Sequence, residues 1–428
     1  MCNRQILAVF AVVAFAALAA NSQTISKKFD FGPGKAATGR TQIQATDIYS
    51  KEKGYGFEPG ATVTCSANGG KTNSGYCSSD KPFYFSAAVP EGNYRVTITF
   101  GGKNEGSVTT VKAELRRLMI EKVETQKGKF ATASFTVNIR TPMIAGGGEV
   151  KLKDREKASE RWAWDEKLTL EFNNSHPAID SIEIEKVDVP TIFLLGDSTV
   201  CDQPSEPYAS WGQMLTRFFK PDIAIASHAE SGESLNSSYG AKRLAKVLTL
   251  IKKDDYVLLQ FGHNDEKEKG DGVGAFTTYK ASLKKYIAEI RAKGGIPVLI
   301  TPMHRRTFDT SGQITNSHGD YPEAVRQAAK ETNAPLIDLT EMSKPLYEAL
   351  GPERSKLAFK DGDATHHNNY GSYELAKCII EGIKANKLGI VKYLMSGLSA
   401  FDPAHPDSLK KFALPASPSV TDVKLLGN

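Results

Sequence analysis

The chain has 428 residues, enough for two domains, and with 40% hydrophobic and 24% charged residues its composition excludes bulk disorder. The net charge is +5, from 54 basic and 49 acidic residues. This mild excess suits an acidic substrate, whereas nucleic-acid binding would require basic clustering or a known motif, and the sequence has neither.

The N-terminal segment has the pattern of a secretory signal peptide. Arg4 precedes an apolar run from Ile6 to about Ala20, which ends in small residues. A membrane anchor is the alternative, but the run is shorter than the roughly 20 apolar residues that span a bilayer comfortably. We expect residues 1–20 to be removed, and a secreted or periplasmic mature protein without a membrane span.

Residues 23–188 predict an all-β sandwich, because short runs alternate apolar and polar residues between Gly, Pro and Asn. The predicted strands are Phe83 to Val89, Tyr94 to Phe100, Thr132 to Ile139, Leu168 to Phe172 and Ser181 to Val187. Cys65 and Cys77 flank a Gly/Ser/Asn-rich stretch and could close a small disulfide loop. Cys201 and Cys378 could also pair, which the sequence does not decide.

Residues 190–395 predict an α/β domain with a mostly parallel, doubly wound sheet, because continuous apolar strands alternate with helical stretches. The strands are Thr191 to Leu195, Ile223 to Ala226, Tyr256 to Phe261, Ile296 to Thr301 and Pro335 to Leu339. The helices are Trp211 to Phe219, Ala241 to Ile251, Phe276 to Lys293, Tyr321 to Thr332 and Tyr370 to Lys387. Residues 396–428 are rich in proline, and we expect an extended tail packed along one of the domains.

Three polar motifs follow successive strands, where ligands of such folds bind. Ser198 lies in GDSTV after the first strand, Gly232 in SHAESGES after the second, and Asn264 in GHND after the third. A serine can attack an ester, a glycine can bring its N–H close to a ligand, and an asparagine amide can face a developing oxyanion. Each motif alone is more typical of a turn.

A fourth motif, DGDATHHNNYG, directly precedes the last helix. Asp363 and His366 are three residues apart, so both side chains can lie on one side of a turn and the carboxylate can orient the imidazole. Asp361 and His367 are the local competitors. A helix cap is the alternative interpretation of an Asp-x-x-His sequence at this position.

Ser, Gly, Asn and Asp/His in this order are the block signature of GDSL/SGNH hydrolases, and the chain resembles that superfamily. A closer resemblance, over about Thr191 to Lys387, is to rhamnogalacturonan acetylesterases. It rests on IFLLGDSTV, WGQMLTRFF, LLQFGHND, TPMHRRTF, GDYPEAVRQAAKETNAPLIDL and DATHHNNYG. The N-terminal region is loosely similar to the galactose-binding-like modules found beside such esterases.

The resemblance implies a flavodoxin-like SGNH fold and removal of acetyl groups from galacturonic acid residues of pectic rhamnogalacturonan. It implies Ser198 as nucleophile, His366 as general base and Asp363 as its orienting acid, with no metal or cofactor. The oxyanion hole would consist of the Ser198 and Gly232 N–H groups and the Asn264 side chain. The stretch ESGESLNSS departs from the family pattern, in which a basic residue commonly follows the serine, so local substrate contacts there are open.

Further candidates for substrate binding are less specific. Arg305 and Arg306 could bind galacturonate carboxylates or form a solvated basic loop, and His263 is a third candidate. Trp162 and Trp164 are two apart, which in a strand places them on one face. They could stack on sugar, although core packing of the sandwich is the favoured interpretation.

Two alternatives to this function stay open from sequence. The first is an SGNH esterase that acts on another acylated glycan, such as xylan or sialic acid, or on lipid. The second is a polysaccharide-binding protein with an inactive esterase domain, which the complete set of five site residues argues against.

Overall fold

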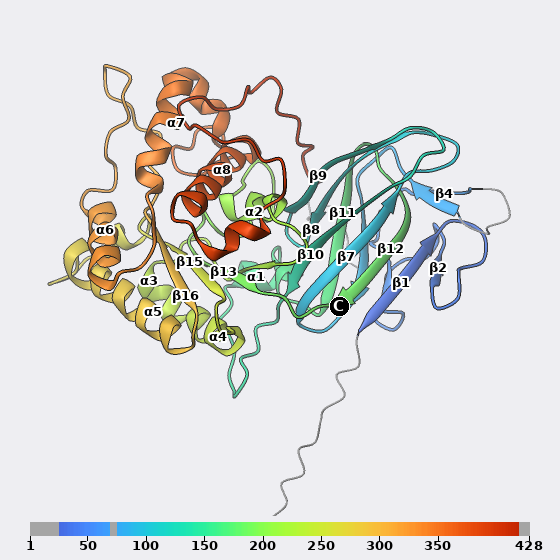
Figure 1. Cartoon of the computed structure of the whole chain (residues 1–428), viewed down its shortest axis with the longest axis horizontal. Coiled ribbons are helices and arrows are strands. Elements are labelled where there is room, and N and C mark those ends of the chain that lie inside the picture. The colour runs from blue at the N-terminus through green and yellow to red at the C-terminus, as the bar shows by residue number, and fades with distance from the viewer. Residues whose placement is uncertain (1–24, 69–74, 419–428) are drawn as a thin grey trace, which may run out of the picture.

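The computed structural model describes residues 25–68 and 75–418, so the predicted signal peptide lies outside the described residues. Two mostly antiparallel sheets face each other in the N-terminal half (Figure 1). The first has the order β10-β7-β12-β1-β2, with β5 also on β12 and β4 on β5. Its strands are β1 (Ser26–Phe31), β2 (Thr41–Ile43), β4 (Thr64–Ala67), β5 (Gly75–Ser78), β7 (Gly92–Phe100), β10 (Ala131–Ile139) and β12 (Ala178–Lys186).

The second sheet has the order β3-β6-β11-β8-β9. Its strands are β3 (Tyr55–Phe57), β6 (Phe83–Ala88), β8 (Ser107–Ala113), β9 (Arg117–Thr125) and β11 (Lys167–His176). Alternate residues of β7, including Val96 and Ile98, are buried with Phe31 and Phe85 between the sheets. The predicted β-sandwich is confirmed.

The C-terminal half contains a parallel five-stranded sheet with the order β14-β13-β15-β16-β17. Its strands are β13 (Thr191–Gly196), β14 (Ala224–Ser227), β15 (Tyr256–Gln260), β16 (Ile296–Ile300) and β17 (Leu336–Ile337). The strand that follows β13 in sequence, β14, lies on one side of it, and the next strand, β15, lies on its other side. The carboxyl ends of β13 and β15 therefore flank the topological switch point where ligands bind in open α/β sheets. The predicted flavodoxin-like α/β fold is confirmed.

Helices cover both faces of this sheet (Figure 1). Because side chains alternate along β13, Leu194 packs in one core with α2, α7 and α8, whereas Leu195 packs in the other with α4, α5 and α6. The α-helices are α2 (Trp211–Leu215), α3 (Leu235–Gly240), α4 (Arg243–Leu250), α5 (Lys280–Ala292), α6 (Tyr321–Thr332), α7 (Leu339–Arg354) and α8 (Asn369–Ala385). Short helical turns are η2 (Thr216–Phe218), η3 (Asp265–Lys267), η4 (Ala275–Tyr279), η5 (Ser355–Ala358) and η6 (Gly389–Tyr393).

The second sheet of the sandwich packs directly against the α/β domain. Leu118 at the start of β9 is part of the core around α2 and α8. Gln213 of α2 donates from Nε2 to the Leu115 carbonyl at 2.6 Å, and the Thr216 hydroxyl donates to the Leu118 carbonyl at 2.6 Å. Buried hydrogen bonds of this kind hold the β8–β9 turn in one position against the neighbouring domain.

The tail after η6 was expected on one domain, but up to residue 418 it contacts both. Tyr370 of α8 donates its hydroxyl proton to the Asp407 carbonyl at 2.7 Å. Farther along, Ser417 donates to Glu171 of β11 at 2.8 Å, and Lys112 of β8 donates to the Pro415 carbonyl at 2.7 Å. The tail therefore bridges the two domains.

The prediction that Trp162 and Trp164 lie in a strand is wrong. Trp162 belongs to the helical turn η1 (Arg161–Ala163), not to a strand, and Trp164 follows that turn. Both rings are buried, Trp162 edge to face with Tyr84 and Trp164 edge to face with His228 of the α/β domain. They therefore pack in the interior, but in a small cluster separate from the core between the two sheets. Cys201 and Cys378 are free and buried and do not pair, whereas the Cys65–Cys77 disulfide is formed.

Candidate active site

Ser198 lies in a tight turn directly after β13. The buried carboxylate of Asp197 accepts hydrogen bonds from the Thr199 N–H at 2.9 Å and the Thr199 hydroxyl at 2.7 Å, which closes the turn. A Cβ on Gly196 would lie 2.5 Å from a Val200 methyl carbon, so only glycine fits at the position before Asp197. The turn leaves the Ser198 hydroxyl at the carboxyl edge of the sheet.

Ser198, His366 and Asp363 form a continuous hydrogen-bonded chain. Ser198 Oγ lies 2.8 Å from His366 Nε2, and His366 Nδ1 lies 2.8 Å from Asp363 Oδ2. Burial disfavours the charged form of Asp363, but the Thr365 N–H and the His366 side chain and N–H outweigh it and lower the pKa of this carboxyl. Asp363 is therefore a carboxylate that can fix the imidazole tautomer and stabilise its protonated form.

The two local competitors have other environments. His367 is buried, and its Nε2 lies 2.7 Å from the Tyr347 hydroxyl. Burial lowers the pKa of His367 to about 3, so its ring stays neutral in the fold. Asp361 is exposed at the surface. Of the two Asp/His combinations, only Asp363 with His366 reaches the serine.

The residues expected to form an oxyanion hole lie after the carboxyl ends of three neighbouring strands, Ser198 after β13, Gly232 after β14 and Asn264 after β15. Within residues 25–68 and 75–418, neither the Ser198 nor the Gly232 N–H donates a hydrogen bond to a protein acceptor. Gly232 adopts φ +77°, a conformation that favours glycine. Asn264 donates from Nδ2 to the Glu233 carbonyl at 3.0 Å, while its Oδ1 accepts from Lys267 Nζ at 3.0 Å, so the amide NH₂ is directed to the Gly232 side.

Family models match both halves of the chain. Residues 194–372 match the model of the GDSL-like lipase/acylhydrolase family, and residues 27–140 match the galactose-binding-like domain of β-agarase/YXIM-type esterases. Rhamnogalacturonan acetylesterase RhgT of Bacillus subtilis (strain 168) is 39% identical over 220 residues, covering 48% of this chain and 94% of that protein. The chain belongs to the rhamnogalacturonan acetylesterase family of GDSL hydrolases. It is an esterase.

Two more relatives from Bacillus subtilis (strain 168) match different fractions of the chain. The uncharacterized esterase YxiM is 29% identical over 371 residues, which is 83% of this chain and 90% of that protein. The probable rhamnogalacturonan acetylesterase YesY is 38% identical over 200 residues, 45% of this chain and 92% of that protein. The similarity to YxiM thus extends over both domains of this esterase.

His263, Arg305 and Arg306, which the sequence predicts to bind substrate, are largely engaged in contacts with other residues of the protein. His263 is buried, with Nδ1 3.3 Å from Asp197 Oδ2 and its ring edge to face with His318. The Arg305 guanidinium lies 2.5 Å from a Glu266 oxygen and donates from Nε to the Thr365 hydroxyl at 3.2 Å. Arg305 therefore supports the loop that carries Asp363 and His366, and a carboxylate ligand would have to displace Glu266.

Arg306 differs from Arg305 in its contacts. Its guanidinium reaches the Pro352 carbonyl at 3.4 Å and lies over the Phe359 ring at 6.0 Å. It has no carboxylate partner among the described residues. Of the two arginines, Arg306 is the one with hydrogen-bonding capacity left for an acidic ligand, and its role in substrate binding stays a prediction.

The sequence did not predict several residues that lie outside the family motifs and contact Ser198 or His366 directly or through a neighbouring loop. Tyr208 lies with its ring edge to face against the His366 ring, at a centroid distance of 5.8 Å. Its loop is held by Arg116 of the sandwich, which donates to the Tyr208 carbonyl at 2.7 Å and pairs with Glu206 at 2.6 Å. Gln203 of the same loop donates to the Ser198 carbonyl at 2.6 Å. The contacts of Tyr208 with His366 and with Arg116 connect segments far apart in sequence, so no local pattern predicts them.

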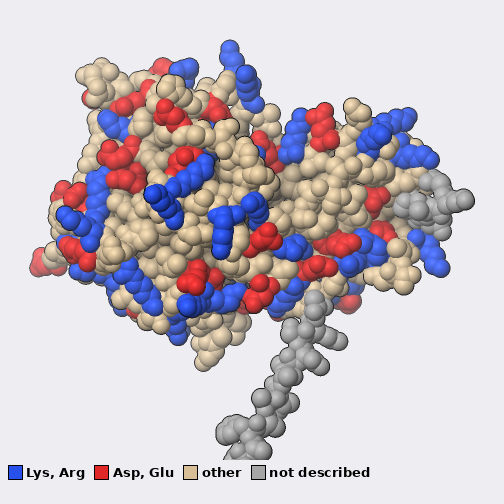
Figure 2. Space-filling view, in the orientation of Figure 1, with Lys and Arg blue, Asp and Glu red and all other residues tan. Residues whose placement is uncertain are grey.

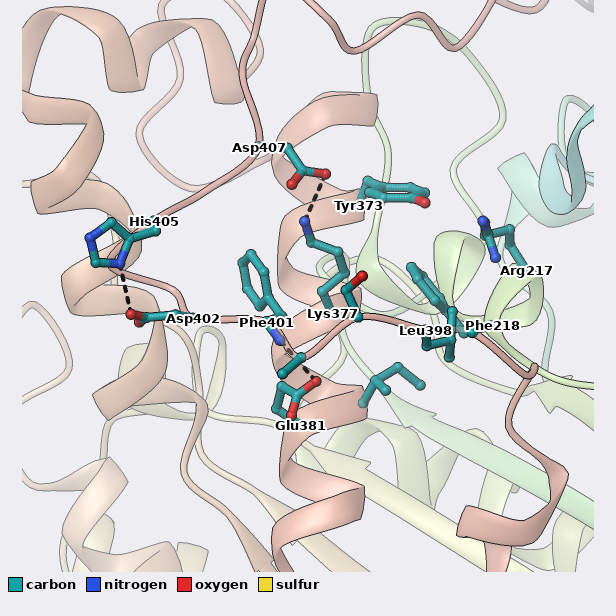
Figure 3. Close-up of a pocket in the computed structure, with 14 residues that line it drawn as sticks. Arg217, Phe218, Tyr373, Lys377, Glu381, Leu398, Phe401, Asp402, His405 and Asp407 are labelled. Atoms are coloured by element: carbon teal, nitrogen blue, oxygen red, sulfur yellow. Dashed lines mark hydrogen bonds and ion pairs between the residues drawn. The ribbon is translucent and has the colours of Figure 1, made fainter.

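A separate cavity of about 420 Å³ lies between the outer side of α8, η2 and the tail (Figure 3). Lys377 bridges Glu374 and Asp407 at 2.8 Å each, and its ammonium lies 4.0 Å from the centre of the Phe401 ring. None of the serine, histidine and aspartate of the hydrogen-bonded chain lines this cavity. The ion pair between Lys377 and Asp407 holds the tail against α8.

Proposed function

We propose that this esterase is an exported enzyme that removes acetyl groups from rhamnogalacturonan by a Ser-His-Asp mechanism. The observation that carries the proposal is the hydrogen-bonded chain Ser198–His366–Asp363 beside two N–H groups with no protein acceptor among the described residues. The choice of polymer is supported by rhamnogalacturonan acetylesterase RhgT, 39% identical over 220 residues, and by the probable rhamnogalacturonan acetylesterase YesY, 38% identical over 200 residues.

The reaction follows from the geometry in two halves. His366 Nε2 accepts the Ser198 hydroxyl proton while Oγ attacks the acetyl carbonyl carbon, and the Ser198 and Gly232 N–H groups with the Asn264 amide bind the developing oxyanion. Each such donor typically lowers the barrier by about 3–4 kcal/mol. The tetrahedral intermediate collapses as the C–O bond to the sugar breaks, and His366 protonates the leaving sugar oxygen.

Water completes the second half. His366 takes a proton from a water molecule that attacks the acetyl group on Ser198, and the same three donors hold the second oxyanion. Collapse of this intermediate releases acetate, and the proton returns to Oγ. Asp363 stays ionised throughout and holds the imidazole in position.

Charge on the surface gives a modest preference for an acidic polymer. Lys and Arg side chains are interleaved with Asp and Glu on the face shown in Figure 2. With a net charge of +5, long-range attraction of pectin is weak, and selectivity has to come from contacts near the site.

Export is supported by two features. The predicted signal peptide, residues 1–20, has the n-region and apolar run that direct secretion. The Cys65–Cys77 disulfide is typical of proteins that fold in an oxidising compartment. No helix in the described part of the chain has the length and apolar character needed to cross a bilayer.

The substrate is tested by measuring acetate released from acetylated rhamnogalacturonan, acetylated xylan and an aryl acetate. We expect the pectic polymer to be deacetylated with the highest kcat/KM of the two polymers. Cleavage of the aryl acetate without release of pectic acetate would leave the esterase chemistry intact and reject this substrate.

A further inference from the structure

The peptide between Ser231 and Gly232 has a bound carbonyl on one side and a free N–H on the other. It is trans, so its C=O and N–H point in opposite directions. The Ser231 carbonyl accepts a hydrogen bond from Lys153 Nζ at 2.6 Å and a second one from the Arg155 guanidinium. Two cationic donors therefore bind the carbonyl of the peptide whose N–H is the expected oxyanion donor.

Both cations come from the sandwich domain. Lys153 precedes the short helix α1 (Asp154–Lys157), which also contains Arg155, and the two side chains bind both ends of the Gly232 loop. Lys153 Nζ lies 2.8 Å from a Glu233 oxygen, and Arg155 donates from Nε to Glu230 at 2.6 Å. Each cation therefore makes two contacts with the loop, one with a glutamate carboxylate and one with the Ser231 carbonyl.

The base of this arrangement is rigid. Glu156 of α1 accepts from the Lys153 N–H at 2.8 Å and pairs with Arg243 of α4 at 2.6 Å, in a fully buried ion pair. Because the Glu156–Arg243 ion pair fixes α1 to α4, the backbone that carries the two cations does not have to reorganise during the reaction. Pre-positioned charge is the kind that contributes most to transition-state stabilisation.

We propose that Lys153 and Arg155 are positioning residues that orient and polarise the Ser231–Gly232 peptide, so that the N-terminal domain completes the oxyanion hole of the esterase domain. Charge-assisted hydrogen bonds to a carbonyl draw electron density from the peptide and make its N–H a stronger donor. The inference rests on the proposed role of Gly232. It gives the sandwich a part in the chemistry beside any part in binding polymer.

A direct contact of Lys153 with substrate is the competing explanation, because its Nζ lies 3.7 Å from where a Cβ on Gly232 would be. A neutral aryl acetate distinguishes peptide polarisation from direct substrate binding, because it has no carboxylate that Lys153 could bind. Peptide polarisation acts on kcat for every acetyl ester, whereas carboxylate binding acts on KM for the acidic polymer alone.

The test is steady-state kinetics of Lys153→Met, Arg155→Gln and the double variant on an aryl acetate and on acetylated rhamnogalacturonan. Lys153→Arg is the rescue variant, since it keeps a cationic donor. Arg95→Ala is the matched control, because Arg95 pairs with Asp222 across the same domain interface at 2.8 Å but contacts no residue of the site. Thermal unfolding of each variant separates loss of fold from loss of rate, and both single variants remove side chains that are partly exposed.

Loss of an oxyanion donor lowers kcat by about 10²–10³, so a weakened donor should lower it by about 10- to 100-fold in the double variant. We expect this loss on both substrates with little change in KM, recovery in Lys153→Arg, and unchanged rates in Arg95→Ala. Wild-type kcat in a folded double variant, or a rise in KM confined to the acidic polymer, would overturn the inference. Full turnover by Ser198→Ala in the same series would instead overturn the proposed function itself.

Discussion

The Tyr208 ring meets the His366 ring edge to face, with the ring centroids 5.8 Å apart, while His366 Nδ1 lies 2.8 Å from Asp363. Tyr208 is partly exposed, so part of its ring is accessible to a ligand bound near His366. Arg116 of the sandwich fixes the Tyr208 carbonyl and the neighbouring Glu206. The sandwich domain thus holds in position an aromatic side chain that contacts His366.

Replacing Tyr208 tests whether this side chain receives a sugar ring. We expect Tyr208→Ala to raise KM for acetylated rhamnogalacturonan by about three- to tenfold, because stacking on an aromatic face contributes about 1 kcal/mol. Tyr208→Phe keeps the ring and should stay near wild type. An equal rise in KM for an aryl acetate would argue for a general disturbance of His366 instead of a lost sugar contact.

Arg305 and Arg306 should differ when each is replaced by alanine. Arg305→Ala leaves the Glu266 carboxylate without its arginine and loosens the contact to Thr365, so kcat should fall at least about tenfold on neutral and acidic substrates alike. Arg306→Ala should leave aryl acetate hydrolysis unchanged and raise KM for the acidic polymer alone. The prediction fails if the two variants behave alike in parallel assays on both substrates.

His367 should contribute to acid instability. Burial holds its pKa at about 3, whereas an unfolded histidine has a pKa of about 6.5. Between these values the unfolded chain binds a proton that the folded chain does not. The contribution of His367 is therefore complete above about pH 6.5 and falls by up to about 1.4 kcal/mol per pH unit as the pH decreases toward 3.

Urea unfolding at several pH values checks this contribution. His367→Gln removes the titration while keeping a hydrogen-bonding group near Tyr347, so its free energy of unfolding should depend less steeply on pH below about 6.5 than that of the wild type. Parallel pH dependences of the two proteins would show that another group dominates.

The disulfide should matter for stability and not for catalysis. Cys65 and Cys77 are 12 residues apart and join β4 to β5 at the end of the sandwich remote from α/β strands (Figure 1). Closing a loop of this length stabilises the fold by about 3 kcal/mol. The double variant Cys65→Ser/Cys77→Ser should lose about that much in denaturant unfolding while keeping the wild-type kcat on an aryl acetate, and a large loss of kcat would contradict the separation.

Much of this architecture follows from local sequence. The alternation in Tyr94 to Phe100 predicts β7, and the apolar run Thr191 to Leu195 predicts β13, because strand periodicity reports burial on one or both faces directly. Helix α7 escaped prediction because Pro345 and Pro352 interrupt its pattern and because strand β17 ends two residues before it.

The site divides in the same way. Ser198, Asn264 and the Asp363–His366 pair lie at strand ends or before a helix, where sequence motifs indicate them. The supports Arg116, Lys153 and Arg155 come from the sandwich, and their partners lie 75 to 92 residues away along the chain. Only tertiary packing brings such pairs together, so no sequence motif could predict them. His263 and Arg305 looked available from sequence because the partners that occupy them, Asp197 and Glu266, are visible only in the fold.

The central claim is that Ser198 is acetylated during turnover, and trapping the acetyl-enzyme tests it most directly. The protein is mixed with an aryl acetate, quenched in acid within the first turnovers, and digested for mass spectrometry. We predict one added acetyl group on the peptide that contains Ser198, and none in Ser198→Ala, which should also lose turnover. An acetyl group on another residue, or a Ser198→Ala variant that still releases acetate at the wild-type rate, would contradict the account.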